Sequence, residues 1–296
     1  MSITHFISYL DCEKKYSPYT ITAYKKDLSS FEDFCENEFQ LKEISEASYP
    51  LIRNWIVALV EMDISNRSIN RKISSLRSYY NFLLKSKQLE EHPLKKHKAL
   101  KVEKKVNVPF SEKEINEVLD FFDQAEDFES IRDKLIIEML YTTGMRRAEL
   151  ISLKITSIDL SQNIVKVIGK RNKERQLPLL LSVKSTVEKY KLVREEIESE
   201  TDSFFITSKG DPIYPTLVYR IINEYFGKVS VKVKKSPHIV RHSFATHLLS
   251  EGADLNSVKE LLGHSSLAST QVYTHSNLKD LKIMYNQAHP RSNKNY

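Results

Sequence analysis

The chain has 296 residues, of which 41% are hydrophobic and 28% are charged, so it is long enough for two packed domains and is not intrinsically disordered. It has no run of about 18 apolar residues, and its amino terminus lacks a basic start and a long apolar centre, which argues against a membrane protein and a secretory signal. Its two cysteines, Cys12 and Cys35, fit neither a disulfide framework nor a metal knuckle, so we expect a cytoplasmic protein.

The charge is unevenly distributed along the chain. Lys and Arg number 45 against 39 Asp and Glu, which gives a net charge of +6. Residues 1–50 carry five basic and nine acidic residues, whereas residues 51–107 carry thirteen and five. A basic region of this kind is typical of a polyanion-binding protein, although solvated lysines on ordinary helices would give the same count.

Residues 1–94 are expected to form a helical domain. All six glycines of the chain lie after residue 143, so this region needs no left-handed turns and fits helices joined by short connections. Ser17-Pro18 begins an amphipathic helix that reaches Cys35, and Pro50 begins a second helix. Apolar residues at spacings of three and four predict a third helix over residues 65–88.

Two groups of basic residues in this region have the chemistry to contact phosphate groups. The first lies beside the apolar stripe of the third helix and comprises Arg67, Arg71 and Lys72. The second belongs to residues 95–108, which we expect to be an extended basic linker because six lysines and one glutamate occupy residues 95–105. Its lysines include Lys95, Lys96 and Lys98. Both groups are also compatible with a plain solvated surface.

Residues 109–296 are expected to form a second domain that is mixed α/β. The periodicity predicts helices over 111–124, 128–142, 182–197, 215–226, 238–250, 254–262 and 278–287, and a helix start at Arg146. The alternating stretches IVKVIGK and ERQLPLL flank the tip Lys170–Lys173 and predict a β-hairpin. The fold class is therefore mainly α with a small β-sheet in the second domain.

Four polar segments of the second domain contain the residues with reactive chemistry. They are TTGMRRAEL (142–150), VIGKRNKERQLPL (167–179), SPHIVRHSFATHLL (236–249) and LLGHSSLASTQVYTH (261–275). His238 and His242 have the spacing of a helical metal pair, with His264 as a third ligand. Arg241 stands between them and no carboxylate is placed to support the metal, so a metal site is disfavoured. For His242 and His247 a structural role is the favoured interpretation.

A site that acts on a phosphodiester is the other interpretation of these segments. Two arginines can neutralise the charge that grows on the phosphate oxygens, a lysine can protonate a leaving oxygen and a tyrosine can be the nucleophile. The arginines take the charge role of a metal ion, and a covalent phosphotyrosine keeps the bond energy for rejoining. Such a site therefore needs neither metal nor ATP.

The four segments, in this order and spacing, resemble the motifs of the tyrosine recombinase (phage integrase) family, and of its Xer branch with C-type and D-type members. The resemblance implies six catalytic residues: Arg146, Lys170, His238, Arg241, His264 and Tyr273. Residues 147 and 148 are arginine and alanine where the family more often has an aliphatic residue and serine. Arg171 occupies a hairpin position where glycine is frequent, and with Lys173 it is expected to contact DNA.

The resemblance implies a fold and a reaction. It implies a helical SAM-like core-binding domain (1–94) and a catalytic domain (109–296) that clamp DNA. Tyr273 attacks the scissile phosphate to give a 3′-phosphotyrosyl enzyme, Lys170 protonates the leaving 5′ oxygen and His238 accepts the tyrosine proton. The other three catalytic residues stabilise the pentacoordinate phosphate, and exchange proceeds through a Holliday junction.

The resemblance also implies partners. They are double-stranded DNA with a dif-like site, a homo- or heterotetramer with a second Xer-type recombinase, and the FtsK translocase, with no cofactor, metal, membrane or small-molecule ligand. The helical domain begins at once, which favours resolution of chromosome dimers during cell division over a phage or transposon integrase. A type IB topoisomerase-like enzyme is a further alternative. The tail helix (278–287) is expected to dock into a neighbour, with packing on its own domain as the rival.

Overall fold

The computed structural model describes residues 3–103, 107–169, 173–263 and 275–292, with the backbone alone for residues 275–280. The chain divides into two compact units, Met1–Lys105 and Val106–Tyr296, and each is described here by itself. The division falls inside the segment 95–108 that the sequence predicts to be a linker. In the described parts of the chain, no helix is long and apolar enough to cross a membrane.

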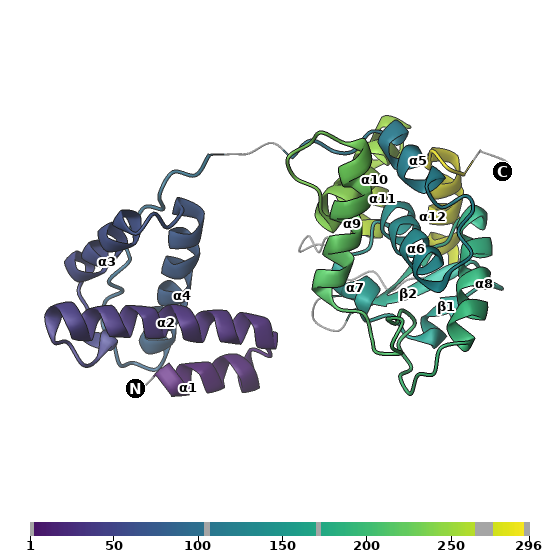
Figure 1. Cartoon of the computed structure of the whole chain (residues 1–296). Helices are drawn as coiled ribbons and strands as arrows, with labels where there is room; N and C mark the ends of the chain where they lie inside the picture. The colour runs from purple at the N-terminus through teal and green to yellow at the C-terminus, as the bar shows by residue number, and fades with distance from the viewer. Residues whose placement is uncertain (1–2, 104–106, 170–172, 264–274, 293–296) are drawn as a thin grey trace. The chain divides into compact units, whose positions relative to one another are not determined.

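The first unit is a small helical bundle (Figure 1). Its elements are α1 (Ile3–Ser8), a short π-helix (Tyr9–Glu13), α2 (Pro18–Phe39), a 3₁₀ turn (Ile44–Glu46), α3 (Tyr49–Glu61) and α4 (Asn66–Lys85). Ser17 and Ser65 cap α2 and α4, because each side-chain oxygen accepts the backbone N–H three residues later. The three helices expected from the sequence are confirmed, whereas the short α1 was not predicted.

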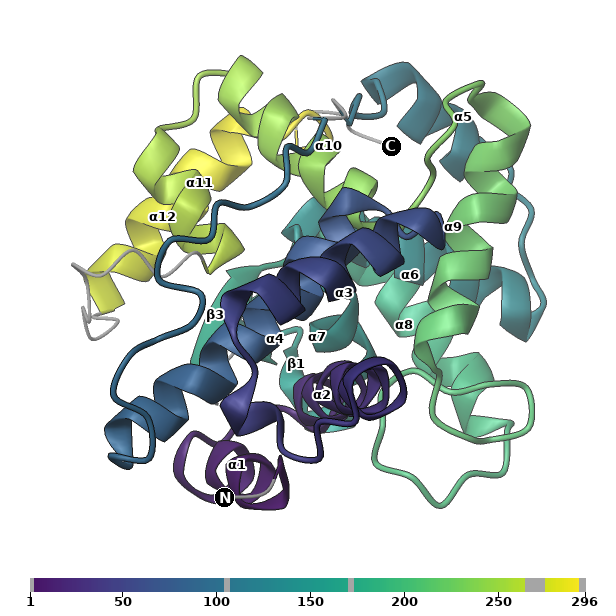
Figure 2. The ribbon, with the colours of Figure 1, turned by 90° about the vertical axis from the view of Figure 1, so that its left-hand side faces the viewer.

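The chain that follows α4 is bound to this helix. The side-chain amide of Asn70 donates to Leu100 O at 2.8 Å and its Oδ1 accepts from Leu100 N at 2.9 Å, while Asn66 Nδ2 donates to Lys101 O at 2.9 Å. Figure 2 shows α1 and α2 nearly end-on and this loop beyond α4. Part of the expected extended linker is thus fixed by amide side chains, which its lysine content did not indicate.

The second unit is mainly helical with one small sheet. Its helices are α5 (Glu112–Asp120), α6 (Phe128–Thr143), α7 (Arg147–Ile151), α8 (Leu181–Glu195), α9 (Pro215–Val229), α10 (Pro237–Ser250), α11 (Leu255–Leu262) and α12 (His275–Ala288). The strands β1 (Ile158–Asp159), β2 (Ile164–Ile168) and β3 (Glu174–Pro178) pair antiparallel in the order β1-β2-β3. The predicted hairpin is β2–β3, in which Ile164 pairs with Pro178 and Ile168 with Glu174.

Helix α6 forms the centre of this unit, between α5, α8, α9 and α10 (Figure 1). It ends at Gly144, whose φ of 61° is left-handed and is a conformation that glycine adopts without strain. A Cβ at this position would lie 2.2 Å from Phe244 Cδ1. The absence of a side chain at Gly144 therefore lets α10 approach the end of α6.

The tail helix α12 packs on its own domain in the single chain. Leu281 and Tyr285 are buried in the core of the second unit, and Tyr285 Oη donates to Thr142 O at 2.5 Å. Ile283 is 56% exposed. Of the two arrangements expected for the tail helix, the single chain shows packing on its own domain. The overall fold class, mainly α with a small sheet, is confirmed.

Candidate active site

Arg146 lies at the start of α7, where a buried carboxylate holds it. Glu149 Oε2 accepts the backbone N–H of Arg146 at 2.6 Å, and Glu149 Oε1 accepts from Arg146 Nη1 at 2.9 Å. The other terminal nitrogen, Nη2, donates to Gly263 O at 3.2 Å. The side chain is 36% exposed. Arg146 is thus fixed in direction and still accessible.

Arg241 comes from α10 and joins the ends of two other helices. Its Nη1 donates to Gly144 O at 2.5 Å and its Nη2 donates to Leu262 O at 2.6 Å. Burial, and next the charge of Arg146, lower the pKa of Arg241 to about 10. The guanidinium therefore stays protonated at neutral pH, and carbonyls at helix carboxyl ends, which carry partial negative charge, surround it.

The two arginines meet at the end of α11. Arg241 contacts the carbonyl of Leu262 and Arg146 contacts the carbonyl of Gly263, so two cationic groups converge on adjacent peptide units. The expected catalytic residues His264 and Tyr273 belong to the segment that follows directly in sequence, outside the described residues. Lys170 and Arg171 also lie outside them.

A buried ion pair supports this arrangement. Arg175 of β3 donates from Nη1 and Nη2 to the two carboxylate oxygens of Glu149 at 2.7 and 2.9 Å, and from Nε to Leu261 O at 3.1 Å. Their side chains are 7% and 3% exposed. Burial alone would raise the pKa of Glu149, but the bonds from Arg175 and then Arg146 hold this pKa below its ordinary value.

This supporting role of Arg175 was not predicted from the sequence. Arg175 is buried in β3 and lies on the same face of the strand as the buried Leu177, two residues later. An arginine on the buried face of a strand requires an acidic partner, and this is the signal that could have revealed the pair. Gly263 makes room for it, because a Cβ there would lie 3.2 Å from Arg175 Cζ.

His238 lies in the first turn of α10, one turn before Arg241, and its side chain is exposed. Burial of part of the ring lowers its pKa below the ordinary value, and the nearby Arg147 and Arg241 lower it further. The imidazole is therefore neutral at pH 7 and has a nitrogen that can accept a proton. The charge of Arg146 also lowers this pKa, so the structure brings His238, Arg146 and Arg241 near one another.

The other histidines of α10 differ from each other. His247 Nδ1 lies 2.9 Å from Tyr141 Oη, which fits the structural role expected for it. His242 is exposed, and the structural role expected for it stays a prediction. Within the described ranges, no three His, Cys, Asp or Glu side chains lie close enough together to bind a metal ion.

The residues expected to contact DNA lie in varied environments. Arg71 and Lys72 both contact the buried carboxylate of Asp27, and the side chain of Lys72 is only 15% exposed. Lys95 pairs with Glu91 at 3.3 Å on the surface. The remaining described residues of this set are exposed, namely Arg67, Lys96, Lys98 and Lys173.

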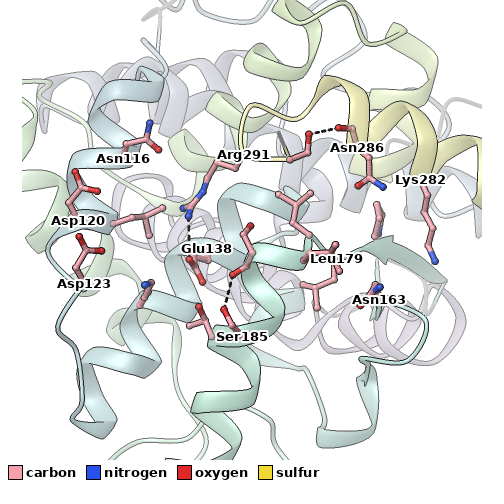
Figure 3. Close-up of a pocket in the computed structure, with 18 of the residues that line it drawn as sticks. Asn116, Asp120, Asp123, Glu138, Asn163, Leu179, Ser185, Lys282, Asn286 and Arg291 are labelled. Atoms are coloured by element: carbon pink, nitrogen blue, oxygen red, sulfur yellow. Dashed lines mark hydrogen bonds and ion pairs between the residues drawn. The ribbon is translucent and has the colours of Figure 1, made fainter. Parts of the chain in front are cut away.

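A separate cavity of about 850 Å³ lies beside α5, α6, α8 and α12 (Figure 3). Glu138 and Arg291 face each other there, with Glu138 Oε1 3.7 Å from Arg291 Nη2. Burial raises the pKa of Glu138, although Arg291 opposes this. None of Arg146, His238 and Arg241 lines the cavity, so it is distinct from the cluster described above.

Comparisons with known proteins agree with this geometry. The family described as the phage integrase family matches residues 108–280, and the phage integrase N-terminal SAM-like domain matches residues 3–87. The chain is 39% identical to the tyrosine recombinase XerC of Anoxybacillus flavithermus, over 97% of each chain. It is 36% identical to XerC of Bacillus subtilis, over 97% of this chain and 95% of that protein.

A solved structure has a similar fold. The XerH site-specific recombinase bound to a palindromic difH substrate, in a post-cleavage complex, matches with a TM-score of 0.71 at 22% identity, and the match covers 90% of this chain and 78% of that one. The chain belongs to the phage integrase family. Within that family it is a site-specific tyrosine recombinase of the Xer type, an enzyme that cleaves and rejoins DNA.

Proposed function

We propose that this chain resolves chromosome dimers at a dif-like site in the cytoplasm during cell division. The similarity to relatives named XerC over nearly the whole chain favours this role over phage or transposon integration. A topoisomerase-like role is separated from it by strand exchange between two duplexes, which relaxation of a single DNA does not need.

The observation that carries the proposal is the convergence of Arg146 and Arg241 at Leu262 and Gly263. Two guanidinium groups held by buried or helix-end partners can receive the non-bridging oxygens of one phosphate without reorganising. The proposed nucleophile Tyr273 follows in the sequence after Gly263, the residue whose carbonyl accepts from Arg146.

In the proposed reaction Tyr273 Oη attacks the scissile phosphorus, and the bond to the 5′ oxygen breaks. Lys170 gives a proton to that leaving oxygen, and the neutral His238 accepts the proton of the tyrosine. Arg146, Arg241 and His264 stabilise the pentacoordinate phosphate. The free 5′ hydroxyl of a partner duplex then attacks the phosphotyrosine and regenerates Tyr273, first giving a Holliday junction.

The proposed assembly is a tetramer on two synapsed sites, built from this chain alone or with a second Xer-type recombinase. The FtsK translocase is the proposed regulator. DNA contacts are assigned to Arg67, Arg71, Lys72, Lys95, Lys96, Lys98, Arg171 and Lys173. The excess of basic residues in 51–107 supports the assignment of the first six.

The test uses a labelled duplex that carries the candidate chromosome-terminus site of the host and a nick next to the cleavage position. The full chain is incubated with this duplex in EDTA, and covalent complexes are separated on a denaturing gel. The wild type is expected to give a covalent band. Arg146→Lys and Arg241→Lys keep the charge but lose the planar fork, so we expect the rate of band formation to fall about 100-fold.

A matched control is Arg194→Lys on α8. Its guanidinium also donates to backbone carbonyls, those of Ser203 and Phe204, but it belongs to a different part of the domain. This variant should form the covalent band at the wild-type rate. Equal rates for Arg146→Lys, Arg241→Lys and the wild type would contradict the proposed role of the two arginines.

A further inference from the structure

A buried carboxylate in the first unit holds an exposed arginine in a fixed direction. Asp27 lies on α2, is 1% exposed, and accepts from Arg71 Nη1 at 2.5 Å and from Arg71 Nη2 at 2.7 Å. Ser75 Oγ donates to the same carboxylate at 2.8 Å, and Lys72 Nζ lies 3.4 Å from it. A buried charge with this many partners has one favourable geometry, so the guanidinium plane of Arg71 is fixed as well.

The contact with Asp27 uses only one edge of the guanidinium. Nη1 and Nη2 together form its end, whereas Nε–H and the second N–H of Nη2 form a side edge with two parallel donors. The Arg71 side chain is 53% exposed, and within the described residues no protein acceptor is recorded for its Nε. This side edge has the geometry to bind two neighbouring acceptors.

The charge around Arg71 favours an anionic partner. Helix α4 carries five basic residues and no acidic one. Arg67 lies one turn before Arg71 and is also exposed. In the first half of α2, Lys25 and Lys26 are basic, and Asp27, which Arg71 already neutralises, is the sole acid. These two helix segments therefore carry basic residues and no exposed carboxylate, which favours a nucleic acid as partner.

We propose that Asp27 pre-orients Arg71 so that its Nε and Nη2 donors bind a two-acceptor edge of the target duplex. Two edges of DNA offer this chemistry: the non-bridging oxygens of a phosphate, and the O6 and N7 of a guanine in the major groove. The inference rests on the proposed function and assigns the role of one residue in site recognition. Arg71 contacts the DNA, and Asp27 is its positioning residue.

The first test compares two arginine-to-lysine substitutions that keep the charge of the full chain. Arg71→Lys removes the two-donor edge, whereas Arg53→Lys changes an exposed arginine of α3 that is not held by a buried carboxylate. Affinity for the host-site duplex is measured by fluorescence anisotropy at fixed salt. We expect Arg71→Lys to bind about tenfold more weakly and Arg53→Lys to bind like the wild type.

A set of duplexes in which each G·C pair is replaced in turn distinguishes the two edges. If Arg71 binds a guanine, the loss caused by Arg71→Lys disappears on the duplex that lacks this guanine. If Arg71 binds a phosphate, the loss is the same on every duplex. Either pattern supports the proposal. Wild-type affinity of Arg71→Lys on every duplex would overturn it and leave a purely structural ion pair.

For the second variant, Asp27→Asn, pre-orientation and simple charge attraction predict opposite changes in DNA affinity. It raises the net positive charge by one, so charge attraction alone predicts tighter binding. Pre-orientation predicts weaker binding, because Arg71 is no longer held. Circular dichroism at the assay temperature checks that the variant is folded. Tighter binding by a folded Asp27→Asn protein would contradict the proposal.

The outcome can be separated from failure of the proposed function. If the wild type neither binds nor cleaves the host-site duplex, the function itself fails. If the wild type forms the covalent complex and the Arg71 and Asp27 variants bind as it does, only the pre-orientation of Arg71 fails.

Discussion

The ion pair between Arg175 and Glu149 gives the sharpest prediction about the catalytic domain. Replacing Arg175 by methionine keeps much of the side-chain volume but leaves Glu149 buried with Arg146 as its remaining cationic partner. Removing one partner of a buried ion pair costs about 3–5 kcal/mol. Because Arg146 still contacts Glu149, we expect the lower end of this range, about 3 kcal/mol.

The assay is thermal unfolding of the full chain, monitored by differential scanning calorimetry. For a domain of this size, about 3 kcal/mol corresponds to a fall of roughly 6–12 °C in the Tm of the catalytic domain. The control is Lys166→Met, which changes an exposed position of the neighbouring strand β2 and should alter the free energy of unfolding by less than about 0.5 kcal/mol.

The same variant tests whether the pair positions Arg146. With Glu149 less constrained, the guanidinium of Arg146 loses its fixed direction, and we expect covalent-complex formation to slow by about 100-fold at a temperature where the variant is folded. DNA affinity should change much less. An unchanged Tm, or a loss of DNA affinity as large as the loss of rate, would refute the reasoning.

Three further predictions concern backbone shape and protonation. Gly144→Ala should lower the free energy of unfolding by about 2 kcal/mol or more, because the new Cβ would overlap Phe244 and the residue has a positive φ. The control Gly227→Ala has open space around its Cβ and should instead raise the free energy of unfolding by about 0.5–1 kcal/mol. Urea unfolding measures both. Burial lowers the pKa of His289 to about 3, so below about pH 6.5 the unfolded chain binds a proton at this residue and the folded chain does not. The free energy of unfolding should therefore fall by about 2 kcal/mol from pH 7 to pH 5. His289→Asn should flatten that pH dependence. Burial and neighbouring cations lower the pKa of His238, so the single-turnover cleavage rate should fall to half its plateau at a pH below the ordinary histidine value of about 6.5. An inflection above pH 6.5 that His238→Gln removes would oppose this.

The helices were predictable where local signals set their ends. Ser17 and Pro18 mark the start of α2, and Gly144 marks the end of α6. The strand β1 has two residues, which is too short to show alternation. The π-helical turn after α1 likewise has no local signal, because five residues do not define a period.

The candidate site was predictable as a set of residues and not as an arrangement. The motifs indicated Arg146, His238 and Arg241, and the structure brings these three together. Their partners are distant in sequence: Arg241 binds the carbonyl of Gly144, 97 residues away. Similarly, the sequence placed Arg71 on a solvated or phosphate-binding face, and only the packing of α2 on α4 shows its contact with Asp27.

The most direct test of Tyr273 as the nucleophile identifies the residue that becomes covalently linked to DNA. The full chain is trapped on the nicked host-site duplex without metal, digested with nuclease and trypsin, and the modified peptide is sequenced by mass spectrometry. We expect a nucleotide attached through phosphate to Tyr273, and no adduct in Tyr273→Phe. An adduct on any other residue, or one that persists in Tyr273→Phe, would contradict this expectation.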